Sequence, residues 1–470
     1  MHFRPRQSRS GTRGRRSPAG GGRGPAEARL KTPRRIGILG HVGNGNLGDE
    51  AIIDALLRGV REAVPDAEFT AFTVRPADTE ARHGIRAFPL RRGADAVRTA
   101  PPAVAAVEPR PTSSARSTLR RIPGLGFLLS RAAAASRRLV DWSREASFWV
   151  VRWRRMRGVD LLIVAGSNQL SDYYGGAWGF PYTLWAWSLA ARLAGARVAY
   201  LSVGAGPIRE RRSGAILRAA LSLADYRSYR DVGSCEAIAA IGFPGPLVRA
   251  PDLAHGLRIA PASGPASDAG VGAGMLVAIN PLPYFDPRSW AERDAAVYSA
   301  FVETMAGFAK ALLARGDRVR FVPTQLRADP QVIADILRAM GPAADGATAE
   351  SLAPAVTDFD DLVAQLTAAD FIVATRFHGV LISQMLGKPT IGIVYRRSTR
   401  DLLVDVGQGD YAVDIREITP ALLLERLAAL SRDGGAKDRI QRRLEEYRKD
   451  LRAQYATLLG IAPHASSRET

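Results

Sequence analysis

The chain has 470 residues, which leaves room for two or three domains, and 46% of them are apolar, enough for a large core. Its single cysteine, Cys235, excludes intramolecular disulfides and cysteine-based zinc sites and fits a reducing compartment. The formal net charge of +19 is concentrated in two places, because residues 1–35 carry a net +10 and residues 91–158 a net +11, which leaves −2 for everything else.

This uneven charge argues against a nucleic-acid-binding body. The folded part is close to neutral, and the sequence has no zinc-finger pattern and no aromatic strand of the kind that stacks on RNA bases. We therefore expect no nucleic-acid partner. No apolar run reaches about 18 residues, so no membrane-spanning helix is expected. The start of the chain lacks the apolar stretch of a signal peptide, and we expect a cytoplasmic protein.

The first part of the chain alternates strands and helices. Residues 1–34 are Arg, Gly, Ser and Pro and predict a disordered basic tail. Residues 35–260 predict the first domain. Apolar runs indicate strands over 35–40, 67–74, 160–166, 197–203, 227–230 and 248–253. Helical periodicity indicates helices over 49–64, 182–194 and 215–224 and a further helix that ends at Ile241.

Residues 91–158 interrupt this alternation. Prolines mark a linker, and residues 119–157 then alternate basic and apolar side chains, which predicts one or two amphipathic basic helices. Such helices could lie on the anionic inner face of a membrane, which makes an anionic membrane a candidate peripheral partner. Alternatively, they pack on the domain while their arginines extend to water.

The second part of the chain repeats the alternation. Residues 261–274 are mostly Gly, Ala, Ser and Pro and predict an interdomain linker, followed by a second domain over residues 275–460 and a disordered tail over residues 461–470. Strands are expected over 275–280, 318–323, 370–375 and 390–395, and helices over 291–314 and within 422–459. Strands separated by helices predict parallel sheets covered on both faces. The expected fold class is α/β, with two Rossmann-like domains facing across a cleft.

The sequence Thr-Arg-Phe-His-Gly over residues 375–379 is the most informative motif. It follows a strand and opens a helix, so Arg376 and His378 stand at the edge of a sheet where α/β proteins bind ligands. A guanidinium and an imidazole at this edge suit an anionic substrate that also needs a proton moved. The alternative is a positive pair that only caps the helix.

A glycine-rich turn over residues 43–48 follows the first strand. It matches the G-x-G-x-x-G dinucleotide fingerprint, but Asp49 and Glu50 occupy the helix start where a pyrophosphate would bind, and no acid ends the second strand to hold a ribose. We prefer a role for Asn44, Asn46 and Asp49 in hydrogen bonding to a hydroxylated ligand. The alternative is a tight turn capped by Asp49.

Two further polar segments follow strands. Residues 166–174 contain amides, a carboxylate and tyrosines, and Asp172 and Tyr173 suit sugar hydroxyls, although a polar surface loop would look the same. Arg230 ends another strand, and Asp231 after it is expected to cap a helix. No histidine pair has the spacing of a zinc site, so we expect no metal.

Taken together, these motifs resemble the polysaccharide pyruvyl transferase family. The resemblance rests on their order over roughly residues 35–400, namely residues 43–50 (GNGNLGDE), 203–208 (VGAGPI), 230–234 (RDVGS), 375–379 (TRFHG), Lys388-Pro389 and Tyr395. It implies a GT-B-like fold and transfer of a pyruvyl group from phosphoenolpyruvate onto two hydroxyls of a sugar. The product would be a cyclic pyruvate ketal in a polysaccharide or glycan precursor, and phosphate would be released.

The resemblance also implies roles for individual residues. Arg230, Arg376 and His378 would handle phosphoenolpyruvate, which acts as a co-substrate, so no cofactor is expected. His378 would be the general acid or a donor to the leaving phosphate, and Asp49 or Asp172 the base toward the sugar. Asn44, Asn46, Asp172 and Tyr173 are the expected acceptor-binding residues, and the acceptor could be lipid-linked.

Three departures from the family pattern affect the acceptor side more than the donor side. Ala165-Gly166-Ser167 stands where a run of glycines is common, Pro251-Asp252-Leu253 replaces an Asp-Pro motif, and residues 91–158 are a long insertion. Two other functions stay open at this point. The first is a GT-B glycosyltransferase that uses a nucleotide-sugar. The second is a non-catalytic protein that binds a membrane or a polyanion through its basic insertion.

Overall fold

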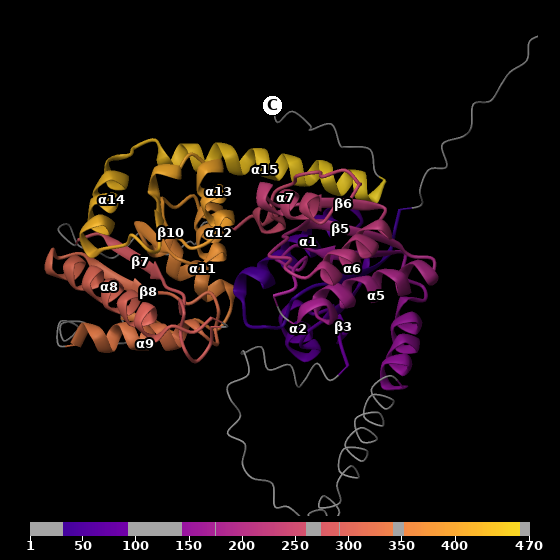
Figure 1. Cartoon of the computed structure of the whole chain (residues 1–470). Coiled ribbons are helices and arrows are strands. Elements are labelled where there is room, and N and C mark those ends of the chain that lie inside the picture. The colour runs from indigo at the N-terminus through magenta and orange to yellow at the C-terminus, as the bar shows by residue number, and fades with distance from the viewer. Residues whose placement is uncertain are drawn as a thin grey trace, which may run out of the picture. The chain divides into compact units, whose positions relative to one another are not determined.

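The computed structural model describes residues 32–92, 143–173, 175–259, 274–290, 292–341 and 352–460. Within these residues the chain forms two parallel sheets, each flanked by helices (Figure 1). The expected basic tail and most of the expected basic helices, including residues 93–142, lie outside the described residues.

The first sheet has six parallel strands in the described part of the chain, in the order β3-β2-β1-β4-β5-β6. Its strands are β1 (Arg35–Leu39), β2 (Glu68–Thr73), β3 (Arg86–Pro89), β4 (Leu161–Ala165), β5 (Arg197–Val203) and β6 (Tyr226–Tyr229). Every residue of β4 is buried, as expected for a strand covered by helices on both faces.

The helices around this sheet are α1 (Leu47–Ala63), α2 (Pro76–His83), α5 (Phe180–Leu193), α6 (Arg211–Ser222) and α7 (Val232–Ala240), with a further helix over residues 143–156 and the 3₁₀ turns η3 (Gly176–Trp178) and η4 (Leu253–Gly256). The start of α1 is well defined chemically. The Asn46 side chain accepts a hydrogen bond from the Gly48 amide, and Asp49 and Glu50 occupy the positive end of the helix dipole.

The second sheet has five parallel strands in the described residues, in the order β11-β10-β9-β7-β8. They are β7 (Leu276–Asn280), β8 (Arg318–Phe321), β9 (Phe371–Ala374), β10 (Thr390–Val394) and β11 (Ala412–Asp414). The accompanying helices are α8 (Ala295–Ala314), α9 (Asp329–Met340), α11 (Phe359–Ala368), α12 (Phe377–Met385), α13 (Arg397–Asp405), α14 (Pro420–Arg432) and α15 (Ala436–Leu459), with the 3₁₀ turn η6 (Gly409–Tyr411).

The last helix, α15, packs against elements of the first half of the chain. It runs from the second half of the chain to the first (Figure 1) and contacts α1 and η4. The Tyr455 ring covers Gly59 of α1 so closely that a side chain there would meet it at 2.5 Å. One continuous apolar cluster includes residues of α1, α12 and α15. The two halves are therefore joined by buried apolar surface in addition to the linker.

Each sheet has one point where the strand order reverses. In the first sheet this point lies between β1 and β4, and in the second between β7 and β9. Ligands of open α/β sheets bind outside the carboxyl ends of the strands at such points. The loops after β1, β4, β7 and β9 are therefore the places to look for a site, and the loop after β9 contains the Thr-Arg-Phe-His-Gly motif.

One described helix, α8, has the length and composition of a membrane span. Seven of its residues, among them Phe301, Met305 and Phe308, are buried in the apolar core of the second half. Core helices meet the same criterion, so we interpret α8 as one of them.

Most of the expected strands and helices are present, with shifts of a few residues at their ends. Several short elements were not expected, among them α2, β3 and β11. Residues 248–253, expected as a strand, form only an isolated bridge between Arg249 and Tyr229 followed by η4. These elements have few residues, and their sequences show neither a sustained apolar run nor a clear period.

Candidate functional site

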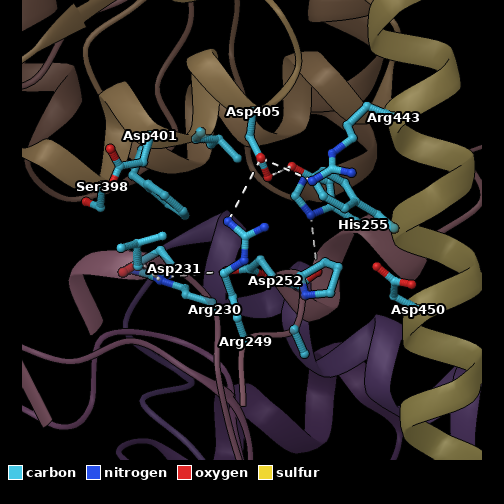
Figure 2. A pocket seen from close by; sticks show the side chains of 16 residues that line it. Arg230, Asp231, Arg249, Asp252, His255, Ser398, Asp401, Asp405, Arg443 and Asp450 are labelled. Atoms are coloured by element: carbon cyan, nitrogen blue, oxygen red, sulfur yellow. Dashed lines mark hydrogen bonds and ion pairs between the residues drawn. The ribbon is translucent and has the colours of Figure 1, made fainter. Parts of the chain in front are cut away.

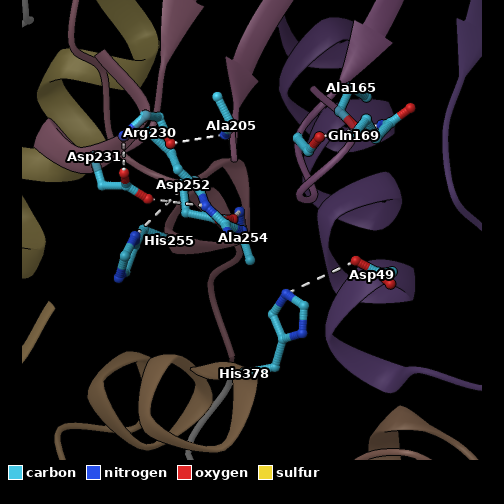
Figure 3. Close-up of polar contacts among 12 residues, drawn as sticks. Asp49, Ala165, Gln169, Ala205, Arg230, Asp231, Asp252, Ala254, His255 and His378 are labelled. Atoms are coloured by element: carbon cyan, nitrogen blue, oxygen red, sulfur yellow. Dashed lines mark hydrogen bonds and ion pairs between the residues drawn. The ribbon is translucent and has the colours of Figure 1, made fainter. Parts of the chain in front are cut away.

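One strand end and two helix starts meet where the two halves of the chain touch. Asp49 comes from the first turn of α1, Arg230 follows β6, and His378 lies in the first turn of α12. The His378 side chain points toward Asp49, and its Nε2 lies 3.9 Å from Asp49 Oδ1 (Figure 3). The sequence-predicted residues Asp49 and His378 are thus brought together from opposite halves of the chain.

The environment of this pair sets its protonation. Burial lowers the pKa of His378, and this effect outweighs the attraction of Asp49 and Asp252. Burial would raise the pKa of Asp49, but a hydrogen bond with His41 and the nearby His378 lower it overall. Near neutral pH the centre therefore holds a neutral imidazole beside a carboxylate. Asp49 Oδ1 and His378 Nε2 are both buried, and neither has a hydrogen-bond partner among the described residues.

Gly48 allows the imidazole to approach α1. A Cβ atom at this position would lie closer than 3.0 Å to His378 Cβ, Cγ and Cδ2, a distance that real Cβ atoms essentially never show. The last glycine of the G-x-G-x-x-G pattern therefore makes room for a side chain of the other half of the chain. This use differs from dinucleotide binding, in which the third glycine brings the helix close to a strand.

Arg230 lies next to the same centre. Its Nη1 is 3.3 Å from Asp252 Oδ2 and its guanidinium carbon is 4.2 Å from the centre of the Phe377 ring, which comes immediately before His378. Gly204, after β5, leaves space for the guanidinium, because a Cβ there would meet Arg230 Nε at 2.8 Å. Arg230 is only 7% exposed at its side chain, so both the aromatic ring and the carboxylate restrict its orientation.

Arg376 is oriented by a carboxylate of the second half. Its Nε lies 2.8 Å and 3.0 Å from the two carboxylate oxygens of Asp329, and its Nη2 also contacts Asp329. Asp329 is fully buried and accepts hydrogen bonds from the Thr324 and Gln325 amides at 3.0 Å and 2.8 Å. This fork-to-carboxylate geometry fixes the plane of the guanidinium.

The glycine-rich turn is bound to the second half of the chain by backbone hydrogen bonds. The Leu47 amide donates to the Thr324 carbonyl at 2.9 Å, and the Leu326 amide donates to the Gly45 carbonyl at 2.8 Å. Gln325 Nε2 donates to the Asn44 carbonyl at 3.2 Å. Residues 324–326, whose backbone Asp329 stabilises, therefore also hold the glycine-rich turn that leads into Asp49.

The predicted acceptor-binding residues are distributed over two loops. Asn44 Oδ1 is buried and has no hydrogen-bond partner in the described part of the chain, whereas Asn46 caps α1 and donates to Asp49 at 2.9 Å. Asp172 is buried and accepts hydrogen bonds from the Arg209 and Glu210 amides, both at 2.8 Å, so it stabilises a loop. The Tyr173 ring lies 5.9 Å from the Arg396 guanidinium, which belongs to the second half.

A cavity of about 120 Å³ adjoins Arg230 on the side of the α13 and α15 helices (Figure 2). It is lined by Arg230 and Phe377, by two further arginines and by five carboxylates, namely Asp231, Asp252, Asp401, Asp405 and Asp450. The excess of carboxylates makes this cavity unsuitable for an anion. No group of three or more His, Cys, Asp or Glu side chains could hold a metal ion within the described ranges.

Comparison with known families identifies the chain. A family model described as polysaccharide pyruvyl transferase matches residues 46–397, which include Asp49, Arg230, Arg376 and His378. The chain belongs to the polysaccharide pyruvyl transferase family. A search of curated proteins found no match. The family implies a sugar acceptor and a pyruvyl donor, and the comparison assigns no role to an individual residue, so the site residues stay predictions.

Solved structures are similar in fold. A protein described as a UDP-N-acetylglucosamine 2-epimerase from Listeria monocytogenes aligns with a TM-score of 0.51 and 10% identity, covering 90% of this chain and 94% of that chain. The UDP-GlcNAc 2-epimerase from Methanocaldococcus jannaschii aligns with a TM-score of 0.50 and 10% identity, covering 88% and 99%. The predicted two-domain, GT-B-like α/β fold is confirmed. At this identity the similarity concerns the fold alone.

Several residues of the site were not predicted to belong to it. Asp252 stands in the sequence only as part of the altered Asp-Pro motif, and no motif in the sequence singles out Asp329 or Gln325. Asp329 follows a strand and precedes a proline at a helix start, which is a weak sign of a buried capping carboxylate. His41 stands at a strand end in the sequence, and its Nδ1 lies 3.7 Å from Asp49 Oδ2.

His83 is connected to the glycine-rich turn through Glu50. Its Nε2 lies 2.8 Å from Glu50 Oε2 and its Nδ1 lies 2.8 Å from Asp54 Oδ1, and Glu50 Oε1 in turn accepts a hydrogen bond from the Gly43 amide at 3.0 Å. Burial would lower the pKa of His83, but the hydrogen bonds with Asp54 and Glu50 raise it to about 9. An imidazolium between two carboxylates therefore fixes the start of the turn.

We expect His83→Gln to lower stability in a pH-dependent way. A folded-state pKa of about 9 against an unfolded value near 6.5 means that the stabilisation is fully present below about pH 6.5 and is lost as the pH rises through about 9, with an upper bound of roughly 3 kcal/mol. Urea unfolding of the parent and the variant at pH 6, 7.5 and 9.5 measures this difference. A difference in unfolding free energy that does not shrink at pH 9.5 would contradict the assignment.

Proposed function

We propose that this protein transfers the pyruvyl group of phosphoenolpyruvate onto two hydroxyls of one sugar and forms a pyruvate ketal. The proposal rests on family membership and on one observation, the meeting of Asp49 and His378 within electrostatic range of Arg230 and Arg376. These four side chains supply what the reaction requires, namely positive charge for a carboxylate and a phosphate and two groups that move protons. The reaction needs no cofactor, because the donor carries its own leaving group.

The chemical balance assigns two proton transfers. Two C–O bonds form between sugar oxygens and C2 of phosphoenolpyruvate, and the bond between C2 and the phosphate oxygen breaks. One hydroxyl proton goes to the methylene carbon, which becomes the methyl group, and the other leaves with phosphate. The acceptor hydroxyls must therefore lose protons while the methylene carbon and the leaving phosphate gain them.

The protonation of His378 and Asp49 before the reaction indicates which residue carries out each proton transfer. His378 is neutral, so it must gain a proton before it can act as an acid, and the first sugar hydroxyl is a source of that proton. In our proposal the imidazole takes this proton and delivers it to the methylene carbon, while the Asp49 carboxylate stabilises the imidazolium that forms in between. Each such role is typically worth 10²–10⁴-fold in rate.

The charges around Arg230 favour one position for the donor. The cavity on the α13 and α15 side is lined by five carboxylates and three arginines, which disfavours an anion. His378 does not line this cavity, and both Arg230 and Arg376 lie within electrostatic range of its imidazole. We therefore place the donor on the His378 side of Arg230 and the acceptor toward the loops that contain Asn44 and Tyr173.

The direct test is incubation of the full chain with phosphoenolpyruvate and a panel of free and lipid-linked oligosaccharides. We expect phosphate release that depends on the acceptor, together with a pyruvylated product detected by mass spectrometry. Absence of phosphate release with every acceptor, together with protection against melting by a uridine or guanosine nucleotide, would favour a nucleotide-sugar glycosyltransferase instead.

Donor binding is tested by Arg230→Lys and Arg376→Lys. Lysine keeps the charge but lacks the planar fork that holds a carboxylate or phosphate by two hydrogen bonds. We expect each variant to raise the Michaelis constant for phosphoenolpyruvate about 10- to 100-fold, because a hydrogen bond to a charged group is lost. The Michaelis constant for the acceptor should change much less. The control is Arg218→Lys, because Arg218 is exposed on α6 and donates to the Ile241 carbonyl. Equal effects on both constants would place the two arginines outside the donor site.

A further inference from the structure

The helix over residues 143–156 exposes an apolar face. Val150, Val151 and Trp153 are 47%, 42% and 40% exposed. With Arg154 and Arg157 they cover the side of the helix that points away from the first half of the chain, because these positions fall on one side at 3.6 residues per turn. These five residues are called the outer face below.

The opposite side of the helix is firmly attached to α5. Arg152 is buried and its Nη1 lies 2.8 Å from Glu145 Oε1, and the Tyr182 hydroxyl donates to the same oxygen at 2.9 Å. Trp149 Nε1 donates to the Tyr182 hydroxyl at 3.0 Å. This network confirms the packing interpretation for one side of the helix. It also means that the outer face is a fixed part of the surface.

The charge of the outer face is positive. Arg154 and Arg157 are exposed, and the Arg157 guanidinium lies 5.2 Å from the Trp153 ring. The one acidic residue among residues 143–157, Glu145, is on the buried side and is neutralised by Arg152. Aliphatic side chains, tryptophan and arginine together are the composition of helices that lie in the interface of an anionic bilayer.

We propose that the outer face binds the surface of a bilayer that contains anionic phospholipid. A second copy of the chain is a weaker candidate, because stable protein interfaces bury about 800 Å² on each partner and five side chains on one helix offer much less. The apolar side chains would enter the headgroup region, and the two arginines would pair with lipid phosphates. The proposal does not depend on the reaction proposed above.

The test compares variants of the full chain by co-sedimentation with vesicles of phosphatidylcholine, with and without phosphatidylglycerol. One variant combines Val150→Ser, Val151→Ser and Trp153→Ser, and a second combines Arg154→Gln with Arg157→Gln. Matched controls are Leu193→Ser, which changes another well-exposed apolar side chain, and Arg211→Gln with Arg212→Gln on α6. Transfer to a water-soluble acceptor is measured in parallel.

We expect binding to the anionic vesicles that weakens with salt. Each arginine should contribute about fivefold to the partition coefficient, and the apolar variant should lower it at least fivefold, while neither control changes it. Transfer to the soluble acceptor should be unchanged in all variants, which separates this proposal from the proposed reaction. The proposal is overturned if the outer-face variants bind like the controls, or if light scattering shows a dimer that the apolar variant dissociates without any change in vesicle binding.

Discussion

Replacing Gly48 with alanine should abolish pyruvyl transfer while the chain remains folded. Alanine in place of glycine within a helix normally stabilises the helix by about 1 kcal/mol. Here the added Cβ would overlap the His378 side chain, including its Cβ atom, which cannot be relieved by a small rotation of the ring. We therefore expect the imidazole to leave its place beside Asp49, with a loss of activity similar to that caused by removing the histidine.

A matched control exists for this substitution. A Cβ at Gly434 would meet no atom within 4 Å in the described structure, so Gly434→Ala should be silent. The measurements are the turnover number with phosphoenolpyruvate and acceptor, and the melting temperature. If Gly48→Ala transferred pyruvate at the parent rate, the approach of His378 to α1 would not be part of the active arrangement.

His378→Gln should lower the turnover number by about 10²–10⁴-fold, the usual contribution of one acid–base group. Glutamine retains a hydrogen-bonding side chain but cannot carry a proton between hydroxyl and carbon. The His378 side chain is 12% exposed and lies between the two halves of the chain, so we expect only a small change in melting temperature. Measuring both quantities separates a chemical role from a structural one.

The pH profile gives a second measure of His378. Because burial lowers the pKa of this imidazole, the neutral form should persist below the ordinary histidine pKa of about 6.5. If the neutral form is the active one, kcat/KM of the parent should decline only at a pH below that ordinary value. This acidic decline should be absent from the pH profile of the residual activity of His378→Gln. A decline centred above 6.5 that the variant also shows would assign the titration to another group.

The sequence predicted the fold class because the signals were long and repeated. Buried runs such as residues 161–165 and the helical period of residues 49–64 are set by local physics, and their alternation restricts the sheets to parallel ones. The short elements α2, β3 and β11 depend on tertiary pairing, so local sequence does not reveal them. The crossing of α15 to the first half could not be seen either, because an amphipathic period shows which side is apolar but not which surface will cover it.

The site was predictable in part for the same reason. Arg376 and His378 stand in one motif at a sheet edge, so their position follows from the strand before them and the helix after them. Their partners do not, because Asp49 and Asp329 reach them only through folding. For Asp172 the structure adds a contact that the sequence did not reveal, since this carboxylate accepts hydrogen bonds from two backbone amides. Its contact with a sugar stays a prediction.

The path of α15 has a consequence for building hybrid enzymes. The helix follows the second half in the chain but packs on both halves, since it contacts α1 and η4 in the first half, and its Arg443 and Tyr447 contact Asp405 of α13 in the second half. A hybrid that takes its first half from one relative and its second half from another by a single junction between the halves would join the last part of α15 to a foreign α1. A second junction between α14 and α15 would only move the mismatch to α13, so a working exchange needs the α1 residues that face α15, such as Gly59, to be exchanged together with that helix.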